Sequence, residues 1–205
     1  MRSEEFGGLN VSRETLERLE TYHELLKKWN PVINLVAKST IDSAWERHFL
    51  DSAQVFSLAP QGVRKWCDLG SGGGFPGLVC ATLAAEFSPE TEFTLVESDQ
   101  RKATFLRTVA RELGLKVTVL SKRIEQVEPL GADLISARAL AALPKLLEFT
   151  ERHLEPGGYA LFQKGESFRK ELSESLESWR FSHEEYPSIT DASSVILRLG
   201  DIERV

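Results

Sequence analysis

Short apolar runs alternate with helical patterns from residue 63 onward, and this alternation is the feature that most narrows the possible folds. The apolar runs, which are typical of strands, cover residues 63–69, 92–97, 116–120, 132–137 and 159–164. The helical patterns between them cover residues 76–87, 99–113 and 139–154. Alternating strands and helices favour right-handed crossovers, a parallel sheet and helices on both of its faces. We therefore predict an α/β fold with a Rossmann-like, mostly parallel sheet flanked by helices.

Helical patterns also precede this region. Residues 12–29 place leucine and aromatic side chains at helical spacing, and Ser12 is a candidate N-cap. The Asn30-Pro31 pair is expected to break this helix. A second helical pattern covers residues 43–56, so at least two helices are expected before the first strand.

We divide the 205 residues into two parts of one structural unit, because no long linker, repeat or low-complexity tract separates them. Residues 1–62 are expected to form an N-terminal helical extension. Residues 63–205 are expected to form the Rossmann-like domain. Within it, the late apolar run at 194–199 is predicted to add an edge strand.

The overall composition is that of a soluble globular protein. Hydrophobic residues make up 41% of the chain and charged residues 27%, and the formal net charge is −6. The sequence lacks both a secretory signal pattern and a run of about 18 apolar residues, so we expect a cytoplasmic protein without a membrane segment. Cys67 and Cys80 do not have the spacing of a metal-binding pair, and we predict neither a metal site nor a disulfide framework.

A glycine-rich stretch, WCDLGSGGGFPGL at residues 66–78, is predicted to turn from the first of these strands into its helix. Glycines let a ligand approach the backbone, and a helix N-terminus favours a carboxylate or phosphate. Gly72, Gly74 and Gly77 match the dinucleotide pattern G-x-G-x-x-G, which is a weak signal alone. Read from Asp68 as D-x-G-x-G-x-G, the stretch resembles the first motif of class I S-adenosylmethionine-dependent methyltransferases. Asp68 is then expected directly beside the ligand cleft.

Four further residues stand where such a cofactor would be held. Glu97 ends the second strand, where a carboxylate can accept from ribose hydroxyls, although it could instead start the next helix, a role that Asp99 fills equally well. Ile124 and Glu125 follow the third strand and suit an adenine, with an ordinary surface pair as the alternative. Arg138 ends the fourth strand, where open parallel sheets bind ligands, with a structural salt bridge as the alternative.

Taken together, these residues give the chain a close resemblance to the RsmG (GidB) family, whose members methylate N7 of a guanosine in the decoding-region loop of 16S rRNA. The matching segments are WNPVINLVA at 29–37, RHFLDS at 47–52, DLGSGGGFPGL at 68–78, VESDQRKATFL at 96–106, RIE at 123–125, SARAL at 136–140 and QKG at 163–165. The resemblance implies a class I methyltransferase fold with S-adenosylmethionine as cofactor. It implies that Gly70 and Phe75 line the cofactor pocket. It also implies that Ile124 and Glu125 meet the adenosine and that Arg138 contacts the cofactor near the transfer site.

The scarcity of acid–base residues fits this chemistry. Guanine N7 carries a free lone pair at neutral pH, so positioning in a shaped site is sufficient and no general base is needed. We therefore assign no catalytic residue, with Arg138 as the one candidate. Base N6 or N4 methylases carry an Asn-Pro-Pro-aromatic motif where this chain reads SARA, and Cys67 and Cys80 flank the glycine loop instead of the acceptor side that a pyrimidine C5 methylase needs.

Basic side chains near the predicted pocket are candidates for RNA phosphate contacts. They are Arg101, Lys102, Arg107, Lys122, Arg123, Lys145 and Lys164. Residues 100–123 hold seven basic side chains and one acid, which indicates either a phosphate-binding surface or a solvated helix face. His48 and Asp51 could reach the cofactor mouth, or His48 could be an ordinary core histidine. We expect a monomer that binds 16S rRNA within the small ribosomal subunit, and neither DNA nor a membrane.

Three other functions stay open at this point. The first is a nicotinamide-dependent oxidoreductase built on the same loop, although a chain of this length leaves little room for its substrate domain. The second is a non-catalytic module that keeps the fold and senses the cofactor or binds a ribosomal partner. The third is a methyltransferase that acts on another RNA, a small molecule or a protein, which the glycine motif alone does not exclude.

Overall fold

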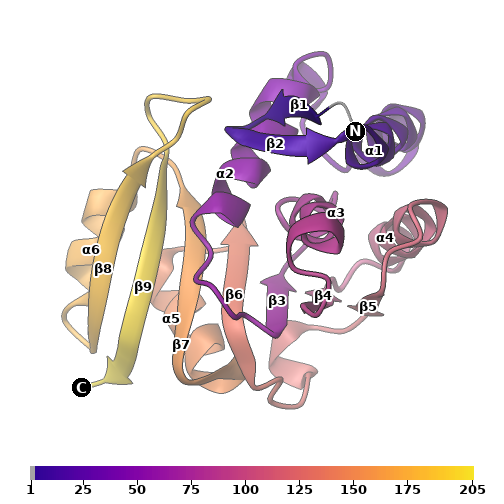
Figure 1. The fold of residues 1–205 in the computed structure, drawn as a ribbon. Coiled ribbons are helices and arrows are strands. Elements are labelled where there is room, and N and C mark those ends of the chain that lie inside the picture. The colour runs from indigo at the N-terminus through magenta and orange to yellow at the C-terminus, as the bar shows by residue number, and fades with distance from the viewer. Residues whose placement is uncertain (1–2) are drawn as a thin grey trace.

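A seven-stranded sheet forms the centre of the computed structural model, which describes residues 3–205 (Figure 1). Its strands are β3 (Lys65–Leu69), β4 (Glu92–Val96), β5 (Val117–Leu120), β6 (Ala132–Arg138), β7 (Leu154–Lys164), β8 (Trp179–Pro187) and β9 (Val195–Arg204). They lie in the order β5-β4-β3-β6-β7-β9-β8. The first five are parallel, whereas β9 runs antiparallel to both β7 and β8. The predicted mostly parallel α/β sheet is confirmed.

Helices cover both faces of this sheet. The helices that follow the first strands are α3 (Gly77–Phe87) and α4 (Gln100–Glu112), and those that follow the later ones are α5 (Leu143–His153) and α6 (Phe168–Ser175). Side chains alternate along each strand, so Trp66 packs toward α3, whereas the neighbouring Cys67 packs toward α5. Within residues 3–205, no helix is long and apolar enough to cross a lipid bilayer.

The N-terminal extension packs over α3 and α4 (Figure 1). It consists of a hairpin, β1 (Ser3–Phe6) and β2 (Leu9–Ser12), followed by α1 (Arg13–Ile33), a 3-10 turn (Lys38–Thr40), a π-helical turn (Trp45–Leu50) and α2 (Asp51–Ser57). Ser12 caps α1 as predicted, because its side chain accepts from the Thr15 N–H. The hairpin was not among the predicted elements, since its strands are short and only Phe6 and Val11 among them are buried hydrophobic residues.

The prediction that Asn30-Pro31 breaks the first helix is wrong. Helix α1 continues through Pro31 to Ile33, and the chain leaves it at Asn34 with a left-handed backbone (φ 51°). Asn30 Oδ1 accepts from the Leu35 N–H at 2.8 Å and the Val36 N–H at 2.9 Å, so it satisfies two backbone donors beyond the helix end. Because Pro31 lies in the last turn, it removes one intrahelical hydrogen bond and leaves the rest of the helix intact.

The prediction that residues 194–199 add an edge strand is also wrong in its placement. They belong to β9, which lies between β7 and β8, and β8 is the edge strand. Val195, Leu197 and Leu199 are buried on one face of the sheet and Ile196 on the other, as expected for an interior strand. Strand β8 was missed because it has the polar, mostly exposed sequence that blunts a sheet edge.

Candidate functional site

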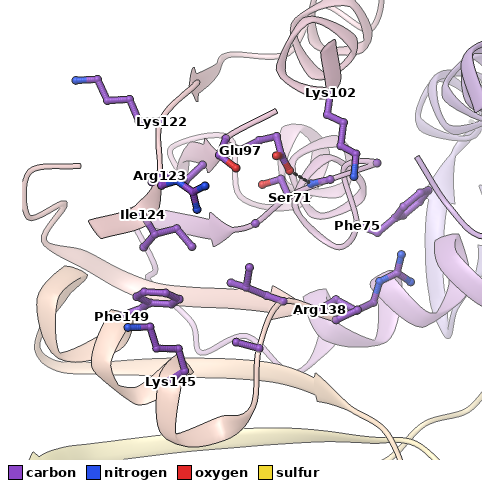
Figure 2. A pocket seen from close by; sticks show the side chains of 18 of the residues that line it. Ser71, Phe75, Glu97, Lys102, Lys122, Arg123, Ile124, Arg138, Lys145 and Phe149 are labelled. Carbon is purple, nitrogen blue, oxygen red and sulfur yellow. Dashed lines mark hydrogen bonds between the residues drawn. The ribbon is translucent and has the colours of Figure 1, made fainter. Parts of the chain in front are cut away.

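Two cavities lie near the carboxyl ends of the parallel strands, where open α/β sheets bind ligands. The first, which we call the glycine-loop cavity, measures about 420 Å³ and lies between the loop after β3 and the ends of β4 and β6. All six residues predicted to bind the cofactor line it, namely Gly70, Phe75, Glu97, Ile124, Glu125 and Arg138. Figure 2 shows Glu97 and Ser71 on one side, Ile124 and Phe149 opposite, and Phe75 with Arg138 at the far end.

Glycine is required in the loop by both its backbone and its neighbours. Gly74 has φ +92°, and a Cβ there would lie 2.4 Å from Tyr22 Oη and 2.7 Å from a methyl of Leu78. Tyr22, on α1, donates its hydroxyl hydrogen bond to the carbonyl of Gly73. The N-terminal extension therefore shapes the loop directly.

Glu97 ties the glycine loop to the start of α4. Its Oε2 accepts from the Gly72 N–H at 2.8 Å, and its Oε1 accepts from the Asp99 N–H at 2.7 Å. Asp99 is the N-cap of α4, and its side chain accepts from the backbone N–H groups of Arg101 and Lys102. Of the two roles considered for Glu97, the start of the helix belongs to Asp99. Glu97 itself is only 8% exposed and lines the cavity. Each carboxylate oxygen of Glu97 retains a lone pair for another donor.

The opposite wall of the glycine-loop cavity is apolar. Ile124 and Phe149 are each 7% exposed, and both line the cavity. The ring of the buried His153 holds the Ile124 backbone in place, because its Nε2 lies 3.1 Å from the Ile124 carbonyl oxygen. Glu125 is exposed at the rim. Phe149 was missed because it belongs to the ordinary apolar face of α5, and no motif distinguishes it from core residues.

Four of the seven predicted phosphate contacts line the glycine-loop cavity: Lys102, Lys122, Arg123 and Lys145. The other three do not. Arg101 pairs with Asp99 at 3.2 Å, and Arg107 donates to the Val119 carbonyl at 3.0 Å. Lys164 forms a nearly buried ion pair with Glu171 at 2.6 Å. The positive rim therefore comes from three separate segments and not from the basic stretch 100–123 as a whole.

Arg138 lies at the boundary between the two cavities and lines both. Its Nη1 donates to His48 Nδ1 at 2.9 Å, and its guanidinium lies 5.0 Å from the centre of the Phe75 ring. Burial lowers the pKa of Arg138, while the charge of Asp51 acts in the opposite direction. No carboxylate within residues 3–205 forms an ion pair with it, which removes the structural salt bridge as an explanation.

His48 is a neutral ring in this position. Burial and the nearby charges of Arg138 and Arg47 lower its pKa to about 3. Because Nδ1 accepts from Arg138, the ring proton belongs on Nε2, which lies 2.9 Å from Thr40 Oγ1. His48 also packs against Phe75, with ring centres 5.2 Å apart. It is therefore part of the wall and not a base in the site.

Asp68 lies beneath the loop, and the expectation that it lies directly beside the ligand cleft is wrong. It is fully buried, and its Oδ1 accepts from Ser136 Oγ at 2.6 Å, which in turn accepts from Trp66 Nε1 at 2.9 Å. A Cβ on Gly77 would lie 2.7 Å from Asp68 Oδ2, so the start of α3 covers this carboxylate. Burial raises its pKa to about 6. Asp68 therefore supports the loop from below.

The second cavity, which we call the hairpin cavity, measures about 460 Å³ and lies between the N-terminal extension and the loop that joins β8 to β9. It shares Leu35, Arg138 and Ala139 with the glycine-loop cavity. Asp51 is one of the charged residues that line the hairpin cavity. The Asp51 carboxylate accepts from Gln163 Nε2 at the end of β7, from Ser188 Oγ at 2.9 Å and from Thr190 Oγ1 at 3.3 Å.

The two cysteines and the acidic residues offer no metal site. Cys67 and Cys80 are buried on opposite faces of the sheet, and burial raises the pKa of both thiols. Over residues 3–205, no group of three His, Cys, Asp or Glu side chains is placed to hold a metal ion.

A family model and several relatives match most of this chain. The family model of rRNA small subunit methyltransferase G matches residues 15–197. A ribosomal RNA small subunit methyltransferase G from Ruegeria pomeroyi is 55% identical over 197 residues, which cover 96% of each chain. The protein of the same name from Rhodospirillum centenum is 56% identical over 192 residues, which cover 94% of this chain and 87% of that one.

Solved structures support the fold at much lower identity. A SAM-dependent methyltransferase from Aquifex aeolicus aligns with a TM-score of 0.59 at 15% identity and covers 87% of this chain and 97% of that one. M. jannaschii TYW2 in complex with AdoMet aligns with a TM-score of 0.56 at 14% identity and covers 83% of this chain and 78% of that one. This chain therefore shares its fold with both of these proteins.

Proposed function

Because this chain belongs to the rRNA small subunit methyltransferase G family, we propose that it transfers the methyl group of S-adenosylmethionine to N7 of a guanosine in 16S rRNA. The observation that carries the proposal is the glycine-loop cavity, which is lined by all six predicted residues although they come from four separate segments of the sequence. The second cavity beside it supplies room for an acceptor. The family's target, a guanosine in the decoding-region loop, is the acceptor we expect.

The lining of the glycine-loop cavity suits S-adenosylmethionine. The free lone pairs of Glu97 can accept from two ribose hydroxyls, and its bonds to Gly72 and Asp99 hold it in that orientation. Ile124 and Phe149 supply apolar surfaces on which an adenine ring packs. The glycine loop lets the amino-acid end approach the backbone, with Gly70 and Phe75 beside it and Arg138 at the transfer end.

The residues at the boundary between the cavities position groups instead of exchanging protons. When bound, S-adenosylmethionine supplies a methyl group on a positively charged sulfur. Guanine N7 attacks with its own lone pair, so no residue has to remove a proton first. The pKa of about 3 keeps His48 neutral at physiological pH, and Arg138 holds its ring in one orientation. The site thus contributes shape and fixed dipoles.

The positive rim suits an RNA partner. Lys102, Lys122, Arg123 and Lys145 surround the opening of the glycine-loop cavity, although the whole chain carries a net charge of −6. Such a local patch can contact phosphates while the remaining surface stays acidic. We expect the protein to act as a monomer in the cytoplasm on a small ribosomal subunit, whose folded RNA presents several phosphates at once.

The decisive experiment measures transfer of a labelled methyl group to small subunits from cells that lack this protein. Naked 16S rRNA and already modified subunits are the controls. Incorporation into unmodified subunits alone, mapped to N7 of a single guanosine, is the expected result. Tight binding of S-adenosylmethionine without any incorporation would show that the acceptor is a different molecule. Stabilisation of the protein by NAD and not by S-adenosylmethionine would overturn the assignment of the cofactor.

A further inference from the structure

We propose that the hairpin cavity receives the acceptor guanine and that Asp51 recognises its Watson–Crick edge. This inference rests on the proposed function, because it assigns the acceptor side of the same reaction. It starts from the position of Arg138, which lines both cavities, and from the Asp51 carboxylate, which lines the hairpin cavity.

The shared boundary decides which way a purine must face. Leu35, Arg138 and Ala139 line both cavities, so ligands in the two spaces meet there. A guanine whose N7 is methylated must direct its five-membered ring toward this boundary. Its six-membered ring, with the N1–H and N2 amino donors, then extends into the hairpin cavity.

Asp51 offers the acceptor that this edge of guanine needs. A carboxylate has about four acceptor positions, and the side chains of Gln163, Ser188 and Thr190 occupy three of them. These donors come from β7 and from the β8–β9 loop, so they fix the carboxylate in one orientation. Asp51 is only partly buried and lines the cavity, which leaves its remaining position for a ligand. Adenine has an acceptor at N1, so its lone pair would be repelled by this carboxylate.

The other walls fit the rest of the base. The neutral ring of His48 lines the cavity and gives a flat surface without a charge. Arg138 uses one N–H on His48 and has further donors at the boundary, where guanine O6 lies beside N7. A donor at one end and an acceptor at the other match guanine and not adenine, the other purine of RNA.

A purely structural role for Asp51 is the alternative, because its three partners also tie the extension to β7 and to the β8–β9 loop. The test therefore measures base recognition as well as activity. Small subunits are assembled from ligated 16S rRNA that carries either guanosine or inosine at the target position. Inosine keeps N7, O6 and N1–H but lacks the N2 amino group. We assign the one remaining acceptor position of Asp51 to the N2 amino group. We therefore expect the wild-type enzyme to methylate inosine, which lacks this group, at least about tenfold more slowly.

The variant Asp51→Asn is then compared on both substrates. We expect its rate on guanosine to fall about tenfold or more and its guanosine-to-inosine ratio to approach one. Asp201→Asn is the matched control, since that exposed carboxylate bonds Ser182 on the same hairpin at 3.1 Å and lies outside both cavities. Its backbone has φ +51°, which asparagine also tolerates. The control should keep the wild-type ratio.

The outcomes separate this inference from the proposed function. A wild-type enzyme that binds S-adenosylmethionine but methylates neither substrate contradicts the proposed function. Equal wild-type rates on guanosine and inosine, or an unchanged ratio in Asp51→Asn, overturns the assignment of Asp51 alone. If a thermal-shift assay with S-adenosylmethionine shows that Asp51→Asn does not fold, Ser188→Ala replaces it, because it loosens Asp51 and keeps the carboxylate. A reduced ratio then supports the assignment, and an unchanged ratio overturns it.

Discussion

The glycine-loop cavity takes every lining residue except Leu35 from residues 70–149, whereas the hairpin cavity collects its lining from segments spread between residues 35 and 196. The first is built from consecutive crossover units, whose strand ends must meet at one edge of the sheet. The second exists only because the N-terminal extension docks on the β8–β9 loop, where Asp51 and Ser188 are 137 residues apart in the chain. A motif can therefore reveal the first cavity, and only the tertiary structure reveals the second.

The largest effect is expected from Gly74→Ala, in the glycine loop. Backbone strain at φ +92° costs about 1–2 kcal/mol, and the clash with Tyr22 and Leu78 adds about 1–3 kcal/mol. Urea denaturation should show a loss of about 2–5 kcal/mol in the free energy of unfolding, with loss of cofactor binding. Gly62→Ala is the control, because Gly62 has φ +82° and a Cβ there would have no atom within 4 Å. This variant should be destabilised by the backbone strain alone. Equal losses would show that the loop is not tightly packed.

The next effect tests the boundary that joins the two cavities. Arg138→Met removes the guanidinium that lines both, and we expect kcat/KM for methyl transfer to fall about 100-fold. Arg198→Met is a matched control, because Arg198 also lies over an aromatic ring, that of Tyr159, but outside the cavities. It should retain wild-type activity. If only the affinity for the cofactor fell, Arg138 would act in the glycine-loop cavity alone, although it lines both cavities.

A smaller effect concerns pH. With a folded-state pKa of about 3 against about 6.5 unfolded, His48 takes up its proton only on unfolding, so it lowers stability as pH falls below 6.5. Asp68, with its pKa raised to about 6, acts oppositely, because its protonation in the folded state adds stability as pH falls below 6. Between pH 7 and pH 5, wild type should lose about 1–2 kcal/mol relative to His48→Gln, after allowance for partial exposure. Parallel pH profiles of unfolding would contradict a buried neutral His48.

The smallest effect compares two acids in the glycine-loop cavity. In Glu97→Gln, one of the two backbone donors, that of Gly72 or Asp99, loses its carboxylate partner, and we expect S-adenosylmethionine affinity to fall about tenfold. Glu125→Gln changes an exposed rim residue and should alter affinity less than about threefold. Isothermal titration of both variants gives the answer. Equal changes would mean that anchoring by the loop backbone does not matter.

Sequence patterns were sufficient for the features set by local chemistry. The strand–helix alternation predicted the parallel sheet, and the residues singled out at strand ends, such as Glu97 and Arg138, line one cavity. Asp68 was misplaced because alternation along β3 directs it under α3 into a fully buried position. The position of β9 was missed because chain order does not determine strand order when a hairpin folds back on the sheet. Ser188 lies in none of the matching segments, and the QKG segment at 163–165 did not indicate that Gln163 bonds Asp51.

The insertion of β9 between β7 and β8 also sets the order in which the molecule can be completed. A chain emerges from the ribosome N-terminus first, and its early segments can begin to fold during synthesis. After β8 has emerged, β7 is still an open edge and β8 has no neighbouring strand, until Val195–Arg204 pairs with both. Only then is the β8–β9 loop closed over Asp51. The glycine-loop cavity, whose lining ends at residue 149, can thus form before β9 is synthesised, whereas the hairpin cavity can form only after β9 has emerged.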